Sequence, residues 1–84
     1  MTASRSMFRP RPKVGEILGI VAELGDDGFV PYRDVASGLG RYREREIGRA
    51  VSSAVKQGLL LERRDPEGRR VVALSIEGWR VRRG

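Results

Sequence analysis

One short stretch, residues 42–57, gathers the side chains best suited to bind an anionic partner. Read at helical spacing, one of its sides carries an aromatic ring, three cations and two hydroxyl groups. These residues are Tyr42, Arg45, Arg49, Ser52, Ser53 and Lys56. Arginine forms paired hydrogen bonds with the O6 and N7 edges of guanine, and polar side chains hold phosphate oxygens. Because Arg45 and Arg49 lie one turn apart, both can reach base edges, and the serines and Lys56 are better suited to phosphates.

The opposite side of this stretch is apolar, with a spacing of three and four residues: Ile47, Ala50, Val51, Ala54 and Val55. This pattern predicts a helix with one buried face. Gly58 stands where a left-handed residue ends a helix. Glu44 and Glu46 suit its first turn and are able to brace Arg49. We therefore interpret residues 42–57 as the second helix of a helix-turn-helix, the one that enters the major groove of DNA.

Two further helices are predicted before this stretch. Between residues 13 and 24 the apolar positions again recur at three and four, at Val14, Ile17, Leu18, Val21 and Leu24. A loop over 25–28 and a short extended piece at 29–30 follow. Pro31 suits the first turn of a helix over 32–39. Its expected inward side chains are Val35, Ala36 and Leu39.

After Gly58 the sequence predicts a β-hairpin. Residues 65–68, DPEG, have the preferences of a type I turn, and β-branched and leucine residues flank them. Four cations surround the tip: Arg63, Arg64, Arg69 and Arg70. We expect Trp79 to pack the last strand against the first helix, and a base-stacking role for this ring is the alternative.

This order of elements predicts an α+β fold, a small winged helix in which a three-helix core with a helix-turn-helix carries a two-stranded β-hairpin as its wing. The prediction divides the chain into a flexible basic arm at 1–12, the winged-helix domain at 13–79 and a basic tail at 80–84. Arg9 and Arg11 in the arm can lie along a minor groove. A tail with incidental charge is the alternative.

Composition excludes several functions. The 84 residues include no cysteine and no histidine, so the sequence predicts no metal site, no cofactor and no enzyme activity. A net charge of +6 favours an acidic partner such as nucleic acid. No apolar run suits a membrane span or a signal peptide, which indicates a cytoplasmic, nucleoid-associated protein without a membrane partner.

At this point the sequence resembles a known family. Gly58-Leu59, Glu62-Arg63, DPEGRR at 65–70, Leu74-Ser75 and Gly78 are similar to the wing segment of MarR-type transcription regulators, and more weakly to PadR-type proteins. The resemblance implies that the helix at 42–57 occupies a major groove and that Arg70 is the wing arginine of the adjacent minor groove. This sequence differs from the family at Gly68. Members of the family usually have an aspartate there, which orients the wing arginine.

Charge segregation supports double-stranded DNA as the partner. Residues 14–40 are acidic overall, whereas the arm, the helix at 42–57, the hairpin and the tail are basic. The leading hypothesis is a sequence-dependent DNA-binding transcription regulator. The alternative is a winged-helix module that docks on structured RNA or on protein in a larger assembly. The family's long C-terminal dimerisation helix has no counterpart in the sequence, so we expect a monomer or a weak dimer.

Overall fold

The computed structural model describes residues 11–25 and 28–83. Its first helix, α2, spans Val14–Gly25, and the short strand β1, Val30–Pro31, leads into helix α3, Tyr32–Gly38. The two helices predicted before the cationic stretch are therefore present, with ends shifted by one residue.

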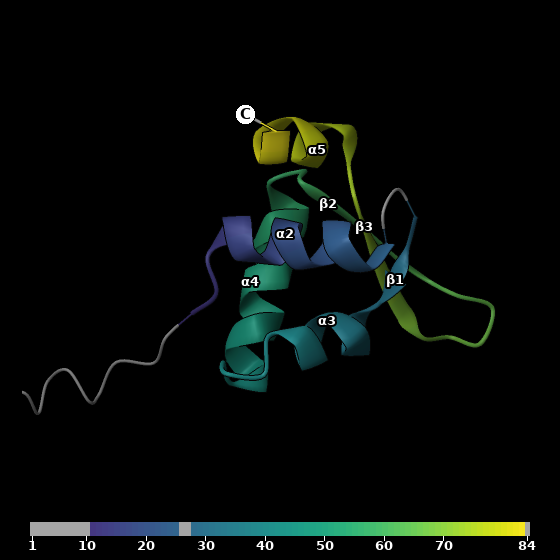
Figure 1. Ribbon diagram of the computed structural model, residues 1–84. Helices are drawn as coiled ribbons and strands as arrows, with labels where there is room; N and C mark the ends of the chain where they lie inside the picture. The colour runs from purple at the N-terminus through teal and green to yellow at the C-terminus, as the bar shows by residue number, and fades with distance from the viewer. Residues whose placement is uncertain (1–10, 26–27, 84) are drawn as a thin grey trace, which may run out of the picture.

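The cationic stretch forms helix α4, Glu44–Lys56, which crosses α2 (Figure 1). It is shorter than the predicted helix because Arg43 has an extended backbone, with φ −75° and ψ 144°, and acts as the N-cap. At the other end, Gly58 has φ +79°, a left-handed conformation that L side chains rarely adopt. The predicted glycine stop is thus confirmed.

The wing is an antiparallel hairpin of β2, Leu60–Arg64, and β3, Arg70–Leu74. In its turn, the N–H of Gly68 donates to the carbonyl oxygen of Asp65 at 2.8 Å, and Gly68 has φ +84°. This is a type I turn followed by a left-handed glycine, a common three-residue hairpin connection. Strand β1 pairs with the other edge of β3, which gives a three-stranded sheet in the order β1-β3-β2.

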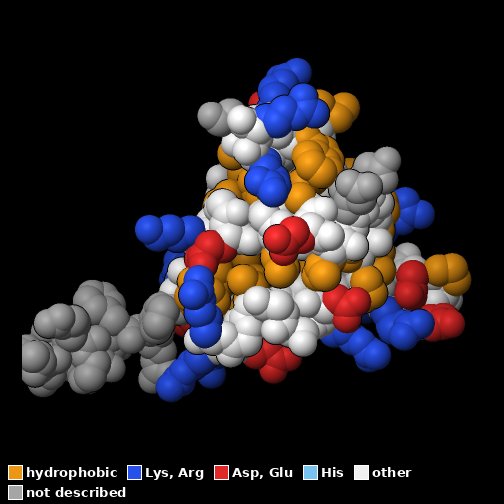
Figure 2. Space-filling view, in the orientation of Figure 1, with side chains coloured by type: hydrophobic (Ala, Val, Ile, Leu, Met, Phe, Trp, Pro, Cys, Tyr) orange, Lys and Arg blue, Asp and Glu red, His pale blue; other side chains and the backbone are white. Residues whose placement is uncertain are grey.

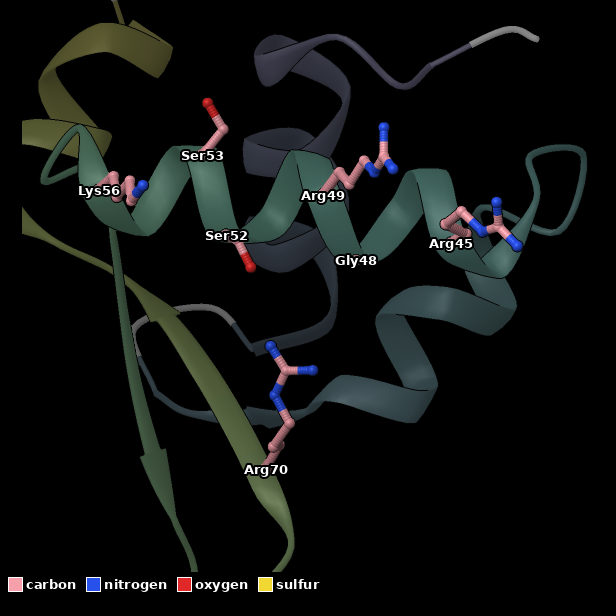
Figure 3. Close-up of a pocket in the computed structure, with 7 residues that line it drawn as sticks. All are labelled: Arg45, Gly48, Arg49, Ser52, Ser53, Lys56 and Arg70. Carbon is pink, nitrogen blue, oxygen red and sulfur yellow. The ribbon is translucent and has the colours of Figure 1, made fainter.

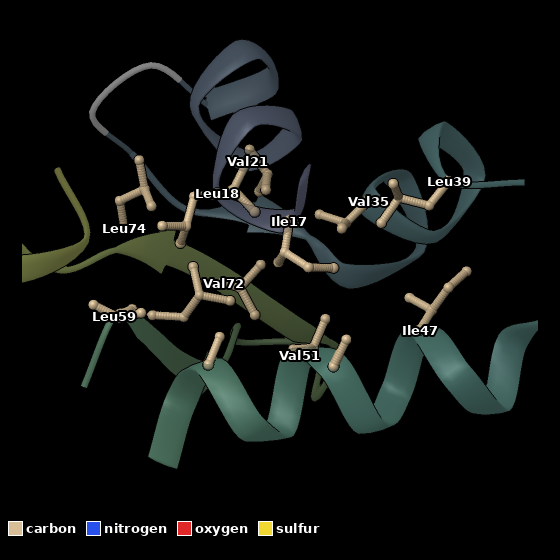
Figure 4. Packing of buried hydrophobic residues seen from close by; sticks show 14 residues of the cluster. Ile17, Leu18, Val21, Val35, Leu39, Ile47, Val51, Leu59, Val72 and Leu74 are labelled. Atoms are coloured by element: carbon tan, nitrogen blue, oxygen red, sulfur yellow. The ribbon is translucent and has the colours of Figure 1, made fainter. Parts of the chain in front are cut away.

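The core lies where α2, α3 and α4 meet the sheet (Figure 4). Its most deeply buried side chains are Ile17, Leu18, Val21, Val35, Ile47, Val51, Leu60 and Val72. The predicted apolar faces are confirmed, with Val14, Ala36 and Val55 only partly buried. Leu24 was expected to point inward, but it is 48% exposed because it lies at the last turn of α2, beyond the packed part of the helix.

A last helix, α5, spans Ile76–Arg83 and packs against α2 (Figure 1). Trp79 is half-buried against the core, as expected of an anchor. Residues 80–83, described from sequence as a tail, continue this helix. At the other end, Pro12 is buried, so the last residue of the predicted arm packs on the domain. None of the described helices is long and apolar enough to cross a membrane.

Candidate nucleic-acid interface

The outer face of α4 and the first residue of β3 line an open groove of about 520 Å³, which we call the α4 groove (Figure 3). Its lining residues are Arg45, Gly48, Arg49, Ser52, Ser53, Lys56 and Arg70. None of them is acidic. Five of the six side chains predicted to bind an anion in the stretch 42–57 therefore line one groove together with Arg70, which lies on a different element.

The burial of the apolar face of α4 fixes the direction of these side chains. Ile47, Ala50, Val51 and Ala54 are buried, so the residues between them point away from the core. Arg45, Arg49 and Lys56 are exposed and form no ion pair with any residue in the described ranges. The centre of the groove thus has positive charge that is free to bind an anion.

Figure 2 shows the face that carries α2. Acidic and basic side chains are interspersed on this face, with several basic side chains gathered over α5. The residues that line the α4 groove, in contrast, include no acidic residue and no residue of α2.

Tyr42 was predicted on the outer face of α4, but it lies in the loop before the helix and is half-buried. Its hydroxyl donates to both carboxylate oxygens of Glu16, at 2.7 and 2.8 Å, and Arg41 also pairs with that carboxylate. The tyrosine hydrogen bond, with a backbone N–H from Lys13 and the arginine, lowers the pKa of Glu16 to about 2. Tyr42 is thus a link between α2 and the start of α4, because α4 begins two residues later than predicted.

Three of the four arginines predicted around the tip of the wing, Arg63, Arg64 and Arg69, each have a contact within the wing or beside it. The guanidinium of Arg63 lies over the ring of Phe29, 4.8 Å from the centroid. Arg64 Nη1 donates to the Gly68 carbonyl oxygen at 2.8 Å. Arg69 pairs with Glu67 and, at 3.5 Å, with Asp65. These cations are exposed, but they are not independent of the turn that carries them.

Asp65 organises that turn. The backbone N–H groups of Arg69 and Glu67 each donate to its Oδ1 at 2.9 Å, and the first of these bonds is the main reason why the pKa of Asp65 lies below its usual value. The carboxylate is therefore occupied by turn hydrogen bonds, in agreement with the structural role predicted for it.

Arg70 is the first residue of β3, directly after the turn, where it pairs with Arg64. Its Nε donates to Glu62 Oε2 at 2.7 Å, and its guanidinium lies 4.2 Å from the centroid of the Tyr32 ring. The hydrogen bond that Arg70 donates to Glu62 is the main reason why the pKa of Arg70 is raised. Arg70 therefore lies next to α3 and α4 and lines the α4 groove, and its entry into a minor groove stays a prediction.

A second hollow, of about 370 Å³, lies on the other side of Arg70. It is lined by Pro31, Tyr32, Arg33, Arg64, Gly68, Arg69 and Arg70. We call it the wing cleft. Sequence reasoning missed Tyr32, Arg33 and Gly48 as lining residues. The sequence contains one hint for Tyr32. It is an aromatic residue outside the apolar positions that were expected to face the core.

Of the two arginines predicted to bind DNA from the arm, only Arg11 lies in the described residues. Arg9 lies outside the described residues. Arg11 Nε lies 3.5 Å from Oε1 of Glu46, whose side chain is only 10% exposed. Glu46 was expected to brace Arg49, but it pairs with Arg11 instead, because Glu46 lies on the buried side of α4. Arg11 therefore contacts the first turn of α4.

Comparisons with known proteins were made for sequence and for structure. No family model and no curated protein matches the sequence. Two solved structures share the fold. A mutant of MepR from S. aureus superimposes with a TM-score of 0.72 at 17% identity over 83% of this chain. The PcaV transcriptional regulator from Streptomyces coelicolor, solved with its natural ligand, has a TM-score of 0.68 at 33% identity over 88% of this chain.

Both solved proteins are winged-helix transcription regulators of the MarR family, and this chain spans about half the length of each, 51% and 50%. The winged-helix fold and the resemblance to MarR-type regulators, predicted from the wing segment, are thereby confirmed.

Proposed function

We propose that this chain binds double-stranded DNA in a sequence-dependent way and regulates transcription. Helix α4 enters the major groove, and the wing contacts the backbone or the adjacent minor groove. The observation that carries this proposal is the α4 groove, in which three unpaired cations, two hydroxyl groups and Arg70 face the same opening with no acidic residue in its lining. The 33% identity with a transcriptional regulator supports it.

The arrangement fits duplex DNA in shape and in charge. A major groove about 12 Å wide admits one α-helix, and α4 offers a face whose side chains are not needed by the core. Arg45 and Arg49 are long enough to reach base edges. Ser52, Ser53 and Lys56 lie on the later turns, where they hold phosphates that fix the register of the helix.

The wing cleft supplies a second set of phosphate contacts. Arg33, Arg64 and Arg69 line it together with Arg70, which also lines the α4 groove. When a DNA duplex binds to α4, the phosphates of the DNA strand that passes the wing would contact these cations. Phosphate contacts of this kind add affinity without sequence preference.

The test is a titration of the pure protein with duplex DNA, single-stranded DNA and RNA at several salt concentrations. Contact with about five to eight phosphates gives a slope of log K against log[salt] of about −4 to −7 on duplex DNA. A preferred duplex, selected from random sequences, is expected to bind more tightly than random duplex. A slope near zero, or equal affinity for all three polymers, contradicts the proposal.

A further inference from the structure

We propose that Glu62 and Tyr32 are positioning residues that hold the guanidinium of Arg70 in one orientation between the α4 groove and the wing cleft. This inference rests on the proposed function. It adds two residues that do not touch the DNA themselves, and it assigns an acidic side chain on the DNA-facing side of the molecule to the support of binding.

The contacts come from three different elements. Glu62 is on β2, where it lies opposite Val72, and Arg70 lies opposite Arg64. Glu62 and Arg70 are therefore diagonal neighbours across the hairpin, a distance that long side chains can span. The bond between them runs through Nε at 2.7 Å, and both side chains are 30% exposed. Because Nε is the atom used, the two terminal nitrogens of Arg70 remain available to an incoming phosphate.

Tyr32 supports the other side of the guanidinium. Its ring lies beneath Arg70 at 4.2 Å, and partial burial raises the pKa of its hydroxyl. The same hydroxyl lies near Gly48 of α4, where an added Cβ would come within 3.5 Å of it. The Tyr32 ring therefore lies between the wing arginine and the middle of α4.

A held guanidinium differs from a free one in what it gives to binding. A long side chain that is already ordered loses little conformational entropy when it binds, and its planar donors keep a fixed direction. MarR-type proteins usually have an aspartate at the position of Gly68 in the turn. Here the carboxylate comes from Glu62, on the strand before the turn. The wing can thus place Arg70 without that aspartate.

The sign of one substitution separates this proposal from simple electrostatics. Removal of an acidic side chain from a surface that meets DNA is expected to strengthen binding, since like charges repel. If Glu62 positions Arg70, Glu62→Ala instead weakens binding to the selected duplex, by about fivefold. Glu62→Gln keeps an acceptor for Nε and is expected to bind at least as well as wild type. Glu67→Ala, which removes another wing carboxylate, is the matched control and is expected to bind as tightly as wild type or more tightly.

A second arginine-aromatic contact in the chain serves as a control for the contact between Tyr32 and Arg70. Arg63 lies over Phe29 much as Arg70 lies over Tyr32, but Arg63 lines neither hollow. Tyr32→Leu is expected to weaken binding several-fold, whereas Tyr32→Phe keeps the ring and Phe29→Leu leaves the Arg70 contacts intact. Both controls are expected to bind as wild type does. In an Arg70→Ala background, Tyr32→Leu and Glu62→Ala are expected to cause no further loss, because both act through Arg70.

The experiment measures dissociation constants of these variants on the selected duplex, together with NMR signals of the Arg70 side chain in the free protein. Ring-current-shifted Hδ signals and a slowly exchanging Hε signal are expected in wild type and in Tyr32→Phe. Loss of the shift is expected in Tyr32→Leu, and loss of the slow Hε exchange in Glu62→Ala. Circular dichroism of each variant checks that the fold is intact, and a variant that does not fold is replaced by Glu62→Ser or Tyr32→Met, with the same expectations.

Four results overturn the inference, the last of them together with the proposed function. Tighter binding by Glu62→Ala shows that its carboxylate only repels DNA. Equal losses from Tyr32→Leu with and without Arg70 show that the tyrosine acts elsewhere. An unchanged affinity of Arg70→Ala, in a protein that Arg49→Ala weakens, removes the role of Arg70 while the proposed function stands. Absence of wild-type affinity for any duplex overturns the proposed function and this inference together.

Discussion

Helix α4 and the wing are both rich in cations, but their cations have different surroundings. Arg45, Arg49 and Lys56 on α4 are exposed and form no ion pair among the described residues. On the wing, Arg69 pairs with two carboxylates and Arg70 with one. A cation without a partner can neutralise a phosphate fully, whereas a paired cation must share its charge. The difference suggests that α4 supplies most of the charge for binding and that the wing supplies orientation.

The same contrast appears along α4 itself. The approach to the helix and its first turn are tied to the rest of the molecule, by Tyr42 and Arg41 to Glu16 on α2 and by Glu46 to Arg11. Within residues 11–25 and 28–83, no hydrogen bond or ion pair ties an outer side chain of the middle turns to another element. The helix is thus fixed at its start, and its central side chains are left free for a partner.

The largest expected effect is on the centre of α4. Arg49→Ala is expected to cost about 1–3 kcal/mol on the selected duplex and little on random duplex, because we propose that its guanidinium meets base edges. Competition binding with both duplexes measures the difference. Arg82→Ala on α5, which also removes an exposed cation, is the control and should leave the preference unchanged. If Arg49→Ala binds both duplexes as wild type does, α4 is not the reading surface.

The comparison of free and paired cations can be tested by salt dependence. Lys56→Ala removes a cation that is proposed to hold phosphate and has no ion pair among the described residues, so it is expected to reduce the slope of log K against log[salt] by about one. Arg69→Ala removes a cation that already has two carboxylate partners, so the slope is expected to change by clearly less. Titrations at four or more salt concentrations give both slopes. Equal changes would show that the pairs on the wing open when DNA binds.

Local patterns in the sequence predicted much of this architecture. The spacing of apolar residues at three and four in α2 and α4 predicts their buried faces, because a short helix is stabilised mainly by burial of one side. DPEG at 65–68 gives the turn of the wing for a similarly local reason. The cationic face of α4 follows from the buried one, and the structure places Arg45, Arg49 and Lys56 along one groove as predicted.

Two of the missed features depend on contacts between separate elements. Tyr42 lies off the cationic face because it binds Glu16, which is 26 residues away in the sequence. Arg70 is held by Glu62, which the register of β2 with β3 brings near, and by the Tyr32 ring on α3, and no local pattern shows either contact. Helix α5 was missed because Ile76 is 79% exposed and most of its other residues are charged, which leaves no clear apolar stripe.

A smaller effect is expected where the arm meets α4. Arg11→Ala leaves the mostly buried carboxylate of Glu46 without its partner. Because Arg11 itself is 62% exposed, the expected loss in the free energy of unfolding is only about 0.5–1 kcal/mol. Urea unfolding measures it. The loss should disappear when Arg11→Ala is combined with Glu46→Gln, and an equal loss in both backgrounds would show that the pair does not form in solution.

The smallest effect concerns the tie between α2 and α4, and it depends on pH. The pKa of Glu16 is lowered from 4.5 to about 2, first by the Tyr42 hydroxyl, so the folded protein favours the ionised carboxylate. A lowered folded-state pKa gives stability that is fully present above about pH 4.5 and is lost as the pH falls toward 2.

Other carboxylates, such as Asp65, also lose stabilising contacts in acid, so the wild-type curve alone does not isolate Glu16. The informative quantity is the difference in melting temperature between wild type and Tyr42→Phe. This difference is expected to be largest at pH 6 and to shrink between pH 4.5 and pH 2, because protonation of Glu16 removes most of what the hydroxyl stabilises. Glu16→Gln, which has no charge to lose, should show little change in this difference. A gap between wild type and Tyr42→Phe that stays constant down to pH 2 would mean that the hydroxyl stabilises the start of α4 by some contact other than the ionised carboxylate.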